Sequence, residues 1–165
     1  MQPLRQIANG MAEVIKTAAI SDEESFDRLE RMADNLMAGD LPSLYEAVLA
    51  SVQFKAQVVS ADEKESGLRE VLNFGHSVGH AIEALMQPAL LHGEAVAIGM
   101  VKEAEIARHL GILSQANFGR LVRCIMSYSL PVTVPTRLPL SAILGKMAVD
   151  KKNKVPRREL VLLEG

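Results

Sequence analysis

The amino-acid sequence predicts a mainly α-helical protein that forms a single domain over residues 1–165. A chain of 165 residues that is 48% hydrophobic can build one sizeable core. With no Trp, four Phe, two Tyr and eight Met, that core must consist of aliphatic residues and Met, as is usual for packed helices. Helix-forming segments fill most of the chain, so we expect at most a short strand near the C-terminus, at residues 159–163.

Three helices are predicted in the first third of the chain. Good helix formers occupy residues 7–20, and a capping box with Ser21 as N-cap and Glu24 reaching back predicts a second helix over residues 22–37. Gly39, Asp40 and Pro42 then interrupt the helical pattern. A third helix is indicated by a stripe at spacings of three and four residues, formed by Leu44, Val48, Val52, Lys55 and Val59.

Four further helices are predicted after the acidic segment 60–67. Residues 71–86 and 93–110 have helical patterns separated by a turn at Pro88, and His109 and Gly111 close the second of them. Another helix fits residues 115–128. Prolines then exclude regular helix until Ser141, which can cap a short helix that runs to about residue 149.

Composition excludes several classes of function. A net charge of −2 gives no basic excess for nucleic acid or for an anionic membrane surface. The single cysteine, Cys124, excludes an internal disulfide, and its apolar neighbours suggest a small buried side chain without thiol chemistry. No apolar run approaches the roughly 20 residues that span a bilayer. We therefore expect a cytoplasmic protein.

Polar residues form a helical stripe in the middle of the chain. If the helix extends back far enough, one face carries Arg69, Asn73, His76, His80 and Glu83. Gly75 and Gly79 lie beside the histidines, and each costs about 1 kcal/mol relative to Ala inside a helix. Close approach of a ligand or of a neighbouring helix would compensate for that cost.

A zinc site is one interpretation of these histidines. His92 follows a Pro-containing turn, so chain reversal could bring it back towards His76. Two imidazoles and one carboxylate would leave an open coordination position, as in catalytic zinc sites. Glu13 is the leading carboxylate because it shares one helix face with Asn9 and Lys16, and Glu94 and Glu65 are weaker candidates. Spacing alone leaves purely structural histidines as the alternative.

Other charged residues have two interpretations each. Lys16 and Lys55 could extend their charged ends to solvent or could line an anion site. The basic segment 150–158 could be a solvated loop or could present cations to a phosphate. His109 is explained by its place in the last turn of a helix, where a cation interacts favourably with the helix dipole.

Three segments carry a family resemblance. Residues 9–16 (Asn-Gly-Met-Ala-Glu-Val-Ile-Lys), residues 62–83, which contain Leu-Asn-Phe-Gly-His, and residues 92–100 (His-Gly-Glu-Ala-Val-Ala-Ile-Gly-Met) resemble the motifs of 3-dehydroquinate synthases. The resemblance extends over nearly the whole chain and is closest to the synthase domain of the fungal pentafunctional arom proteins. It implies the helical C-terminal domain of the dehydroquinate synthase-like fold.

The resemblance also implies a reaction and a set of site residues. The family converts 3-deoxy-D-arabino-heptulosonate 7-phosphate into 3-dehydroquinate and phosphate, in the shikimate route to chorismate and aromatic amino acids, with Zn2+ and NAD. Glu13, His76 and His92 correspond to the zinc ligands, and Lys16, Glu65 and His80 to catalytic residues. Residues expected around the substrate are Lys16, Lys55, Arg69, Asn73, His80 and, less securely, Lys152. A homodimer is also implied.

The sequence departs from the family in one large respect. The N-terminal NAD-binding half has no counterpart, and no Gly-rich phosphate loop replaces it. We therefore expect the isolated chain to need an NAD-binding half, in the same polypeptide or in another, for turnover. The alternatives are a non-catalytic truncated remnant and a related sugar-phosphate cyclase that acts on another heptulose phosphate.

Overall fold

The computed structural model describes residues 4–62 and 67–152, and within these ranges it contains seven α-helices, one 3-10 helix and no strand. The predicted fold class is therefore confirmed, whereas the predicted strand at 159–163 lies outside the described residues. In chain order the elements are α1 (Leu4–Ala19), α2 (Glu23–Met37), α3 (Leu41–Ala61), η1 (Leu68–Asn73), α4 (His76–Met86), α5 (His92–His109), α6 (Gln115–Ser127) and α7 (Leu140–Lys152).

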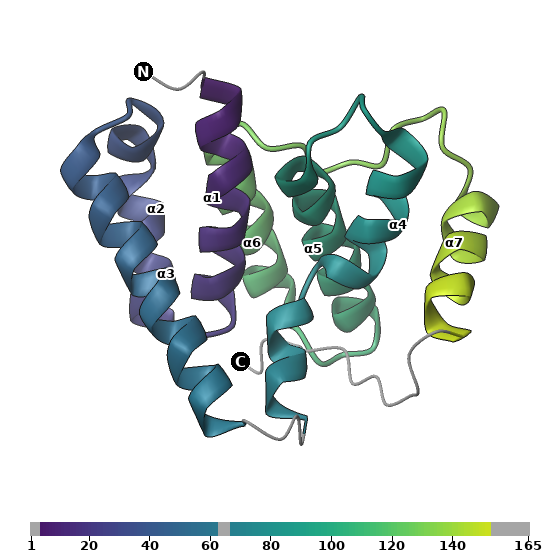
Figure 1. Cartoon of the computed structure of the whole chain (residues 1–165), viewed down its shortest axis with the longest axis horizontal. Coiled ribbons are helices and arrows are strands. Elements are labelled where there is room, and N and C mark those ends of the chain that lie inside the picture. The colour runs from purple at the N-terminus through teal and green to yellow at the C-terminus, as the bar shows by residue number, and fades with distance from the viewer. Residues whose placement is uncertain (1–3, 63–66, 153–165) are drawn as a thin grey trace.

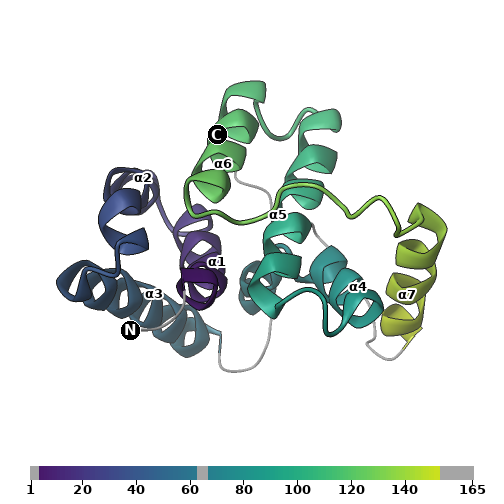
Figure 2. The same ribbon diagram turned by 90° about the horizontal axis from the view of Figure 1, so that it is seen from above.

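Helix α5 lies in the middle of the molecule and contacts helices on both sides. Helices α1, α2 and α3 pack together on one side, and α4 and α7 pack together on the other (Figures 1 and 2). Helix α6 packs against α5, α1 and α2. Because α5 is covered from several directions, its residues from Ala95 to Met100 are almost completely buried, which explains why this helix is apolar on most of its surface.

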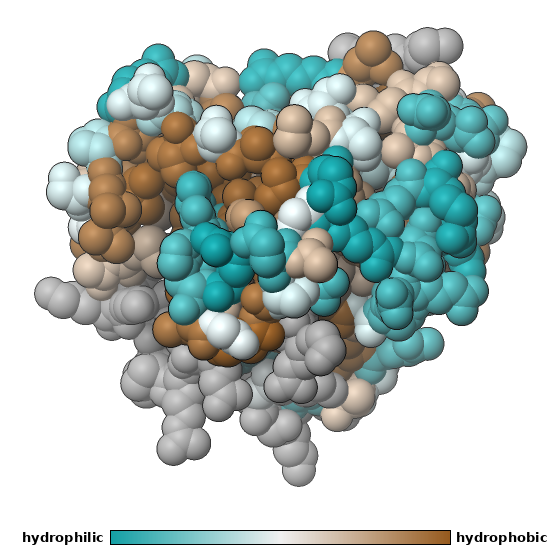
Figure 3. Space-filling model, turned by 180° about the vertical axis from the view of Figure 1, so that it is seen from behind, coloured by the Kyte–Doolittle hydropathy of each residue, from teal (hydrophilic) through white to brown (hydrophobic). Residues whose placement is uncertain are grey.

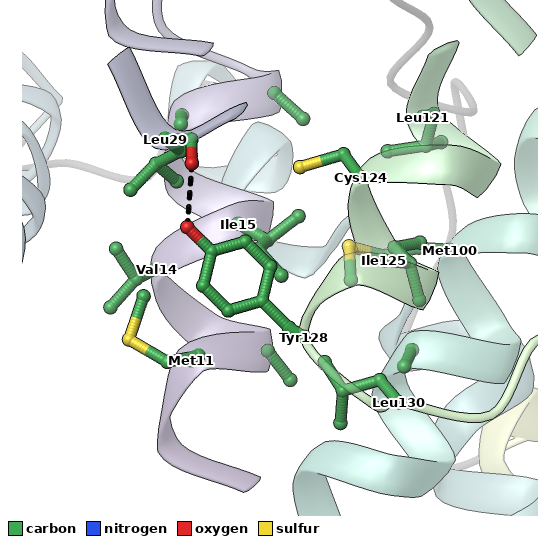
Figure 4. Close-up of a cluster of buried hydrophobic side chains, with 14 of the residues drawn as sticks. Met11, Val14, Ile15, Leu29, Met100, Leu121, Cys124, Ile125, Tyr128 and Leu130 are labelled. Carbon is green, nitrogen blue, oxygen red and sulfur yellow. Dashed lines mark hydrogen bonds between the residues drawn. The ribbon is translucent and has the colours of Figure 1, made fainter. Parts of the chain in front are cut away.

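The larger part of the core joins α1, α2, α5 and α6. Tyr128, Ile15, Met100 and Ile125 are buried in it, and Tyr128 donates a hydrogen bond of 2.7 Å to the backbone carbonyl of Leu29 (Figure 4). A buried hydroxyl needs such a partner, because burial without one is costly. This hydrogen bond ties the C-terminal end of α6 to α2.

A smaller apolar cluster joins α4, α5 and α7. It contains Val78 and Ile82 from α4, Ala95 and Ile98 from α5, and Ile143 from α7. On the face opposite to that of Figure 1, hydrophobic side chains gather on the side of α7, and hydrophilic side chains gather on the other side (Figure 3). No helix in the described part of the chain is long and apolar enough to cross a membrane.

Two predicted helix starts need small corrections. The N-cap of α2 is Asp22, whose carboxylate accepts a hydrogen bond from the Ser25 backbone, whereas the Ser21 hydroxyl donates back to the Ala18 carbonyl. The capping box predicted at Ser21 is therefore wrong by one residue, because a carboxylate in the adjacent position competes successfully for the cap. Helix α7 begins at Leu140, one residue before the predicted cap, Ser141.

Helix α3 contains the whole predicted stripe, but that stripe is not its buried face. The side chains of Val48, Val52 and Val59 are exposed, and the residues that α3 buries are Ser43, Ala47, Ser51 and Val58. Small residues let α3 approach α1 closely, and the Ser51 hydroxyl donates to that of Thr17 at 3.0 Å. Contact with α1 therefore depends on small side chains and on polar pairs, the Ser51–Thr17 pair among them.

The helix predicted over residues 71–86 is divided in two. Residues 68–73 form the 3-10 helix η1, Gly75 has a φ of +77°, and α4 starts at His76. A Cβ at Gly75 would also lie 2.9 Å from the Met100 nitrogen and the Val96 oxygen, and one at Gly79 would lie 3.0 Å from the Val96 Cα. Both glycines thus permit close approach of a neighbouring helix, α5, which was one of the two predicted reasons for them.

Candidate metal centre

Three predicted ligands from three helices meet at one point. Glu13 lies on α1, His76 is the first residue of α4, and His92 is the first residue of α5. One oxygen of Glu13, Oε1, lies 3.3 Å from Nε2 of His76 and 3.6 Å from Nε2 of His92. The two imidazole rings have centroids 5.5 Å apart, so the chain reversal at Pro88 does bring His92 back to His76.

The other ring nitrogen of each histidine is engaged by an oxygen. Nδ1 of His76 lies 3.2 Å from the Phe74 carbonyl, and Nδ1 of His92 lies 3.0 Å from Oε2 of Glu83. A carbonyl or an ionised carboxylate can only accept a hydrogen bond, so Nδ1 carries the proton in both rings. Each Nε2 therefore presents a lone pair towards Glu13, which is the arrangement of metal-binding histidines with an orienting acceptor behind them.

The two oxygens of Glu13 have different surroundings. Oε2 accepts from the ammonium groups of Lys16 at 2.9 Å and Lys55 at 3.0 Å. Oε1 is buried and has no hydrogen-bond donor among the described residues. Burial opposes ionisation of Glu13, but the ammonium groups of Lys16 and Lys55 favour the charged form and hold the pKa of this carboxyl below its usual range. Glu13 is thus a carboxylate with one oxygen available.

These residues fit a zinc ion. Zinc binds imidazole nitrogen and carboxylate oxygen at about 2.0–2.2 Å, so two ligand atoms of a tetrahedral site lie about 3.4 Å apart. The distances of 3.3 and 3.6 Å from Glu13 Oε1 to the two Nε2 atoms are close to that spacing, and all three ligand atoms lie within 4.8 Å of one another. An ion in contact with Oε1 would also give this buried oxygen a partner. Three protein ligands leave one position open, as in catalytic zinc sites.

The remaining predicted site residues lie around this centre to different degrees. His80 is exposed on α4, with its ring centroid 5.0 Å from that of His76 and 6.0 Å from that of His92. Arg69 lies in η1, where its backbone N–H donates to the buried carboxylate of Asp62, and Asn73 ends η1. Glu65 and the side chain of Lys152 lie outside the described residues. The predicted polar stripe therefore continues unbroken only from His76 to Glu83.

Several weaker candidates have other roles. The carboxylate of Glu94, one of the alternative ligands, pairs with Arg5 at 2.6 Å and accepts from the Leu91 backbone at 2.9 Å. His109 is exposed in the last turn of α5, with Nδ1 2.8 Å from the Glu105 carbonyl, as its position predicted. Cys124 is buried, and this burial raises the pKa of its thiol to about 12. Neither His109 nor Cys124 belongs to the metal centre.

Two residues near the histidines were not predicted as part of the site. Glu103 of α5 is 4% exposed, and its carboxylate accepts from the backbone of Gly75 and Val78 at the start of α4. Asn9 of α1 accepts from the Gly93 backbone at the start of α5. Glu103 stands beside Lys102 and close to Glu105 in the sequence, so nothing singles it out, and a linear pattern does not show which helix end such a residue contacts.

Comparison with known proteins identifies related sequences and folds. Residues 10–153 match the family described as 3-dehydroquinate synthase C-terminal. A 2-epi-5-epi-valiolone synthase from Streptomyces hygroscopicus subsp. jinggangensis 5008, with NAD+ and Zn2+ bound, is 31% identical with a TM-score of 0.83, over 93% of this chain and 43% of that chain. A 2-deoxy-scyllo-inosose synthase complexed with carbaglucose-6-phosphate, NAD+ and Co2+ has the same fold, with 24% identity and a TM-score of 0.81, over 94% of this chain and 43% of that one. The chain thus spans about two fifths of the length of these relatives.

Proposed function

This chain belongs to the 3-dehydroquinate synthase C-terminal family, and we propose that it forms the metal- and substrate-binding part of a zinc- and NAD-dependent sugar-phosphate cyclase. The proposed reaction converts 3-deoxy-D-arabino-heptulosonate 7-phosphate into 3-dehydroquinate and phosphate. NAD would be held by an additional domain, in the same polypeptide or in another chain, as the length of the solved relatives suggests.

One observation carries the metal part of this proposal. Within the part of the chain that the structure describes, Oε1 of Glu13 is buried without a hydrogen-bond donor, and it faces Nε2 of both His76 and His92. A buried oxygen without a donor is costly, whereas a cation at this position would satisfy it together with the two ring nitrogens. The relatives with bound Zn2+ and Co2+ support the same assignment.

The chain's own residues would hold and orient the substrate. A zinc ion bound by Glu13, His76 and His92 would supply Lewis acidity to adjacent substrate hydroxyls, and NAD would accept and return a hydride. Lys16 and Lys55 would place positive charge beside those hydroxyls and the substrate carboxylate. His80, one turn along α4 from His76, would contact the phosphate that leaves by β-elimination, and Arg69 and Asn73 would complete this polar surface.

A second candidate is a cyclase for a different sugar phosphate. The solved relatives with this fold include a 2-epi-5-epi-valiolone synthase and a 2-deoxy-scyllo-inosose synthase, so the fold and the ligand set alone do not select a substrate. The substrate proposed here carries a carboxylate. A cation near the metal centre should therefore bind it more tightly than a sugar phosphate without a carboxylate. Lys55 is the half-buried cation at that place.

Calorimetric binding to the zinc-loaded chain tests the proposal. We expect 3-deoxy-D-arabino-heptulosonate 7-phosphate to bind at least tenfold more tightly than carbaglucose-6-phosphate, and Lys55→Met to weaken the first ligand more than the second. Lys102→Met is the matched control, because Lys102 pairs with Glu105 on the surface of α5. A preference for carbaglucose-6-phosphate would favour the second candidate. Binding of neither ligand would overturn both and indicate a non-catalytic remnant.

A further inference from the structure

Both histidines of the metal centre are the first residues of their helices. His76 begins α4 and His92 begins α5. The N–H groups in the first turn of a helix have no partner within that helix, so the start of a helix is held in place only if something else caps it. Neither Gly75 nor Leu91, the residues before the two histidines, provides a side-chain hydrogen bond to its own helix.

The start of α4 is capped from α5. Glu103 is 4% exposed, and it accepts from the Gly75 N–H at 2.7 Å through Oε2 and from the Val78 N–H at 3.1 Å through Oε1. Because these two donors lie on either side of His76 in the sequence, the carboxylate fixes the backbone that carries this ring. Burial raises the pKa of the Glu103 carboxyl, and the N–H donors of α4 act in the opposite direction.

The start of α5 is capped from α1. Oδ1 of Asn9 accepts from the Gly93 N–H at 2.6 Å, and Glu94 accepts from the Leu91 N–H at 2.9 Å. Asn9 lies one turn before Glu13 on α1, so one hydrogen bond links the helix that carries the carboxylate ligand to the residue that follows His92. The three ligands are thereby connected by two interhelical caps.

The two caps also change the electrostatic potential at the metal centre. The N-terminal end of a helix is the positive end of its dipole, which opposes a cation bound by the first residue. A carboxylate at each of these ends, Glu103 at α4 and Glu94 at α5, offsets that positive potential. The geometry and the charge of the caps therefore both favour a metal ion between the two helix starts.

We infer that Glu103 and Asn9 are positioning residues of the metal centre, which hold His76 and His92 in place through the N-termini of their helices. The inference rests on the proposed metal-binding function. It predicts that loss of either cap lowers metal affinity by about tenfold or more, the range found when groups behind metal ligands are removed.

Titration of the metal-free chain with Co2+ alone tests this inference. The visible absorption of bound Co2+ reports its coordination geometry, and the dissociation constant of the complex reports the affinity. We expect Glu103→Gln and Asn9→Leu to weaken Co2+ binding by about tenfold or more and to alter the spectrum. Asn9→Asp keeps the acceptor and should bind Co2+ as the wild type does. Tyr128→Phe also removes a buried hydrogen bond between a side chain and the backbone, but this bond joins the end of α6 to Leu29 of α2, which carry no proposed ligand, so affinity and spectrum should be unchanged.

The outcomes separate the two proposals. If the wild type binds Co2+ and both Glu103→Gln and Asn9→Leu bind it with dissociation constants within twofold of the wild-type value, the positioning role is overturned. The metal site then still stands. Wild type that binds no Co2+ would overturn the metal site and the positioning role together. If Glu103→Gln does not fold, the comparison of Asn9→Leu with Asn9→Asp decides, because only the loss of the acceptor should then weaken binding.

Discussion

At the residue scale, a hydrogen bond or an ion pair holds one polar atom of each proposed ligand, and the other polar atom faces the centre. Oε2 of Glu13 is held by two lysines, and Nδ1 of each histidine is held by an oxygen. Only Oε1 and the two Nε2 atoms face one another. A residue that binds the non-coordinating atom of a ligand therefore affects metal affinity almost as much as the ligand itself does.

Glu83 is the clearest case of such a residue. Its carboxylate lies 3.0 Å from Nδ1 of His92, so Glu83→Gln should weaken zinc binding by about tenfold to 100-fold without abolishing it. Competition with a chromophoric chelator measures this affinity. Glu105→Gln, which changes a surface carboxylate of α5 paired with Lys102, is the control and should not alter it. Equal affinities for the two variants would contradict the role of Glu83.

Cys124 should be unreactive while the chain is folded. The side chain is 2% exposed, and burial raises the pKa of its thiol to about 12. At pH 8 we therefore expect no alkylation by iodoacetamide within the time that completes it in urea, as mass spectrometry would show. Rapid alkylation of the native chain would mean that α6 opens readily.

The same thiol gives a pH dependence of stability with a defined sign. Its pKa in the folded chain is about 12, against about 9 when exposed, so between these values the folded state keeps a proton that the unfolded state has lost. The contribution of Cys124 to the free energy of unfolding should thus fall as pH rises above about 9. Urea titrations of wild type and Cys124→Ala over this range measure the difference between them.

Sequence reasoning named the proposed zinc ligands but not Glu103 and Asn9. Glu13, His76 and His92 could be named because a resemblance covers their motifs and because the residue types suit zinc. Glu103 and Asn9 act on backbone N–H groups of other helices, and such contacts depend on tertiary structure. They leave no periodic pattern in the sequence.

At the element scale, the contact between α4 and α5 is the one that sets the distance between the two histidines. Gly75 just before α4, Gly79 on α4 and Gly99 on α5 let the two backbones approach closely. The turn at Pro88 then returns the chain antiparallel to α4, because Gly75 meets Met100 and Val96 whereas Gly79 meets Val96 and Ala95. The glycines are therefore part of the architecture of the centre.

Substitution at Gly79 tests this contact. A Cβ there would lie 3.0 Å from the Val96 Cα and 3.1 Å from the Ala95 oxygen, both backbone atoms that cannot move aside cheaply. Gly79→Ala should lower the free energy of unfolding by about 1–3 kcal/mol, as overpacking does. Gly10→Ala, in an open position of α1, should raise it by up to about 1 kcal/mol. Urea titration measures both, and equal effects would contradict the close contact.

Element boundaries show where prediction from sequence stops. Helix types and most ends followed from periodicity and from Gly and Pro, as at Gly111 after α5. The break at Gly75 was missed because apolar and polar residues keep a helical period through residues 71–86. On α3 the apolar stripe faces solvent, because contact with α1 selects small residues, and periodicity alone cannot show which face is covered.

At the scale of the whole molecule, the centre joins the two halves of the helical assembly. Glu13 comes from α1, which packs with α2 and α3, and His76 comes from α4, which packs with α7. His92 begins α5, the helix between them (Figure 1). The three ligands are distant in sequence and meet only when these helices are assembled, so metal binding reports on the folded arrangement.

Metal content of the folded chain tests the central claim most directly. After incubation with zinc and removal of excess metal, we expect one zinc ion per wild-type chain by atomic emission, and the same for His109→Ala, whose histidine lies at the far end of α5. Glu13→Gln, His76→Ala and His92→Ala should each retain little or none while circular dichroism shows helices. A well-folded wild-type chain without zinc, or retention of zinc by all three ligand variants, would contradict the assignment.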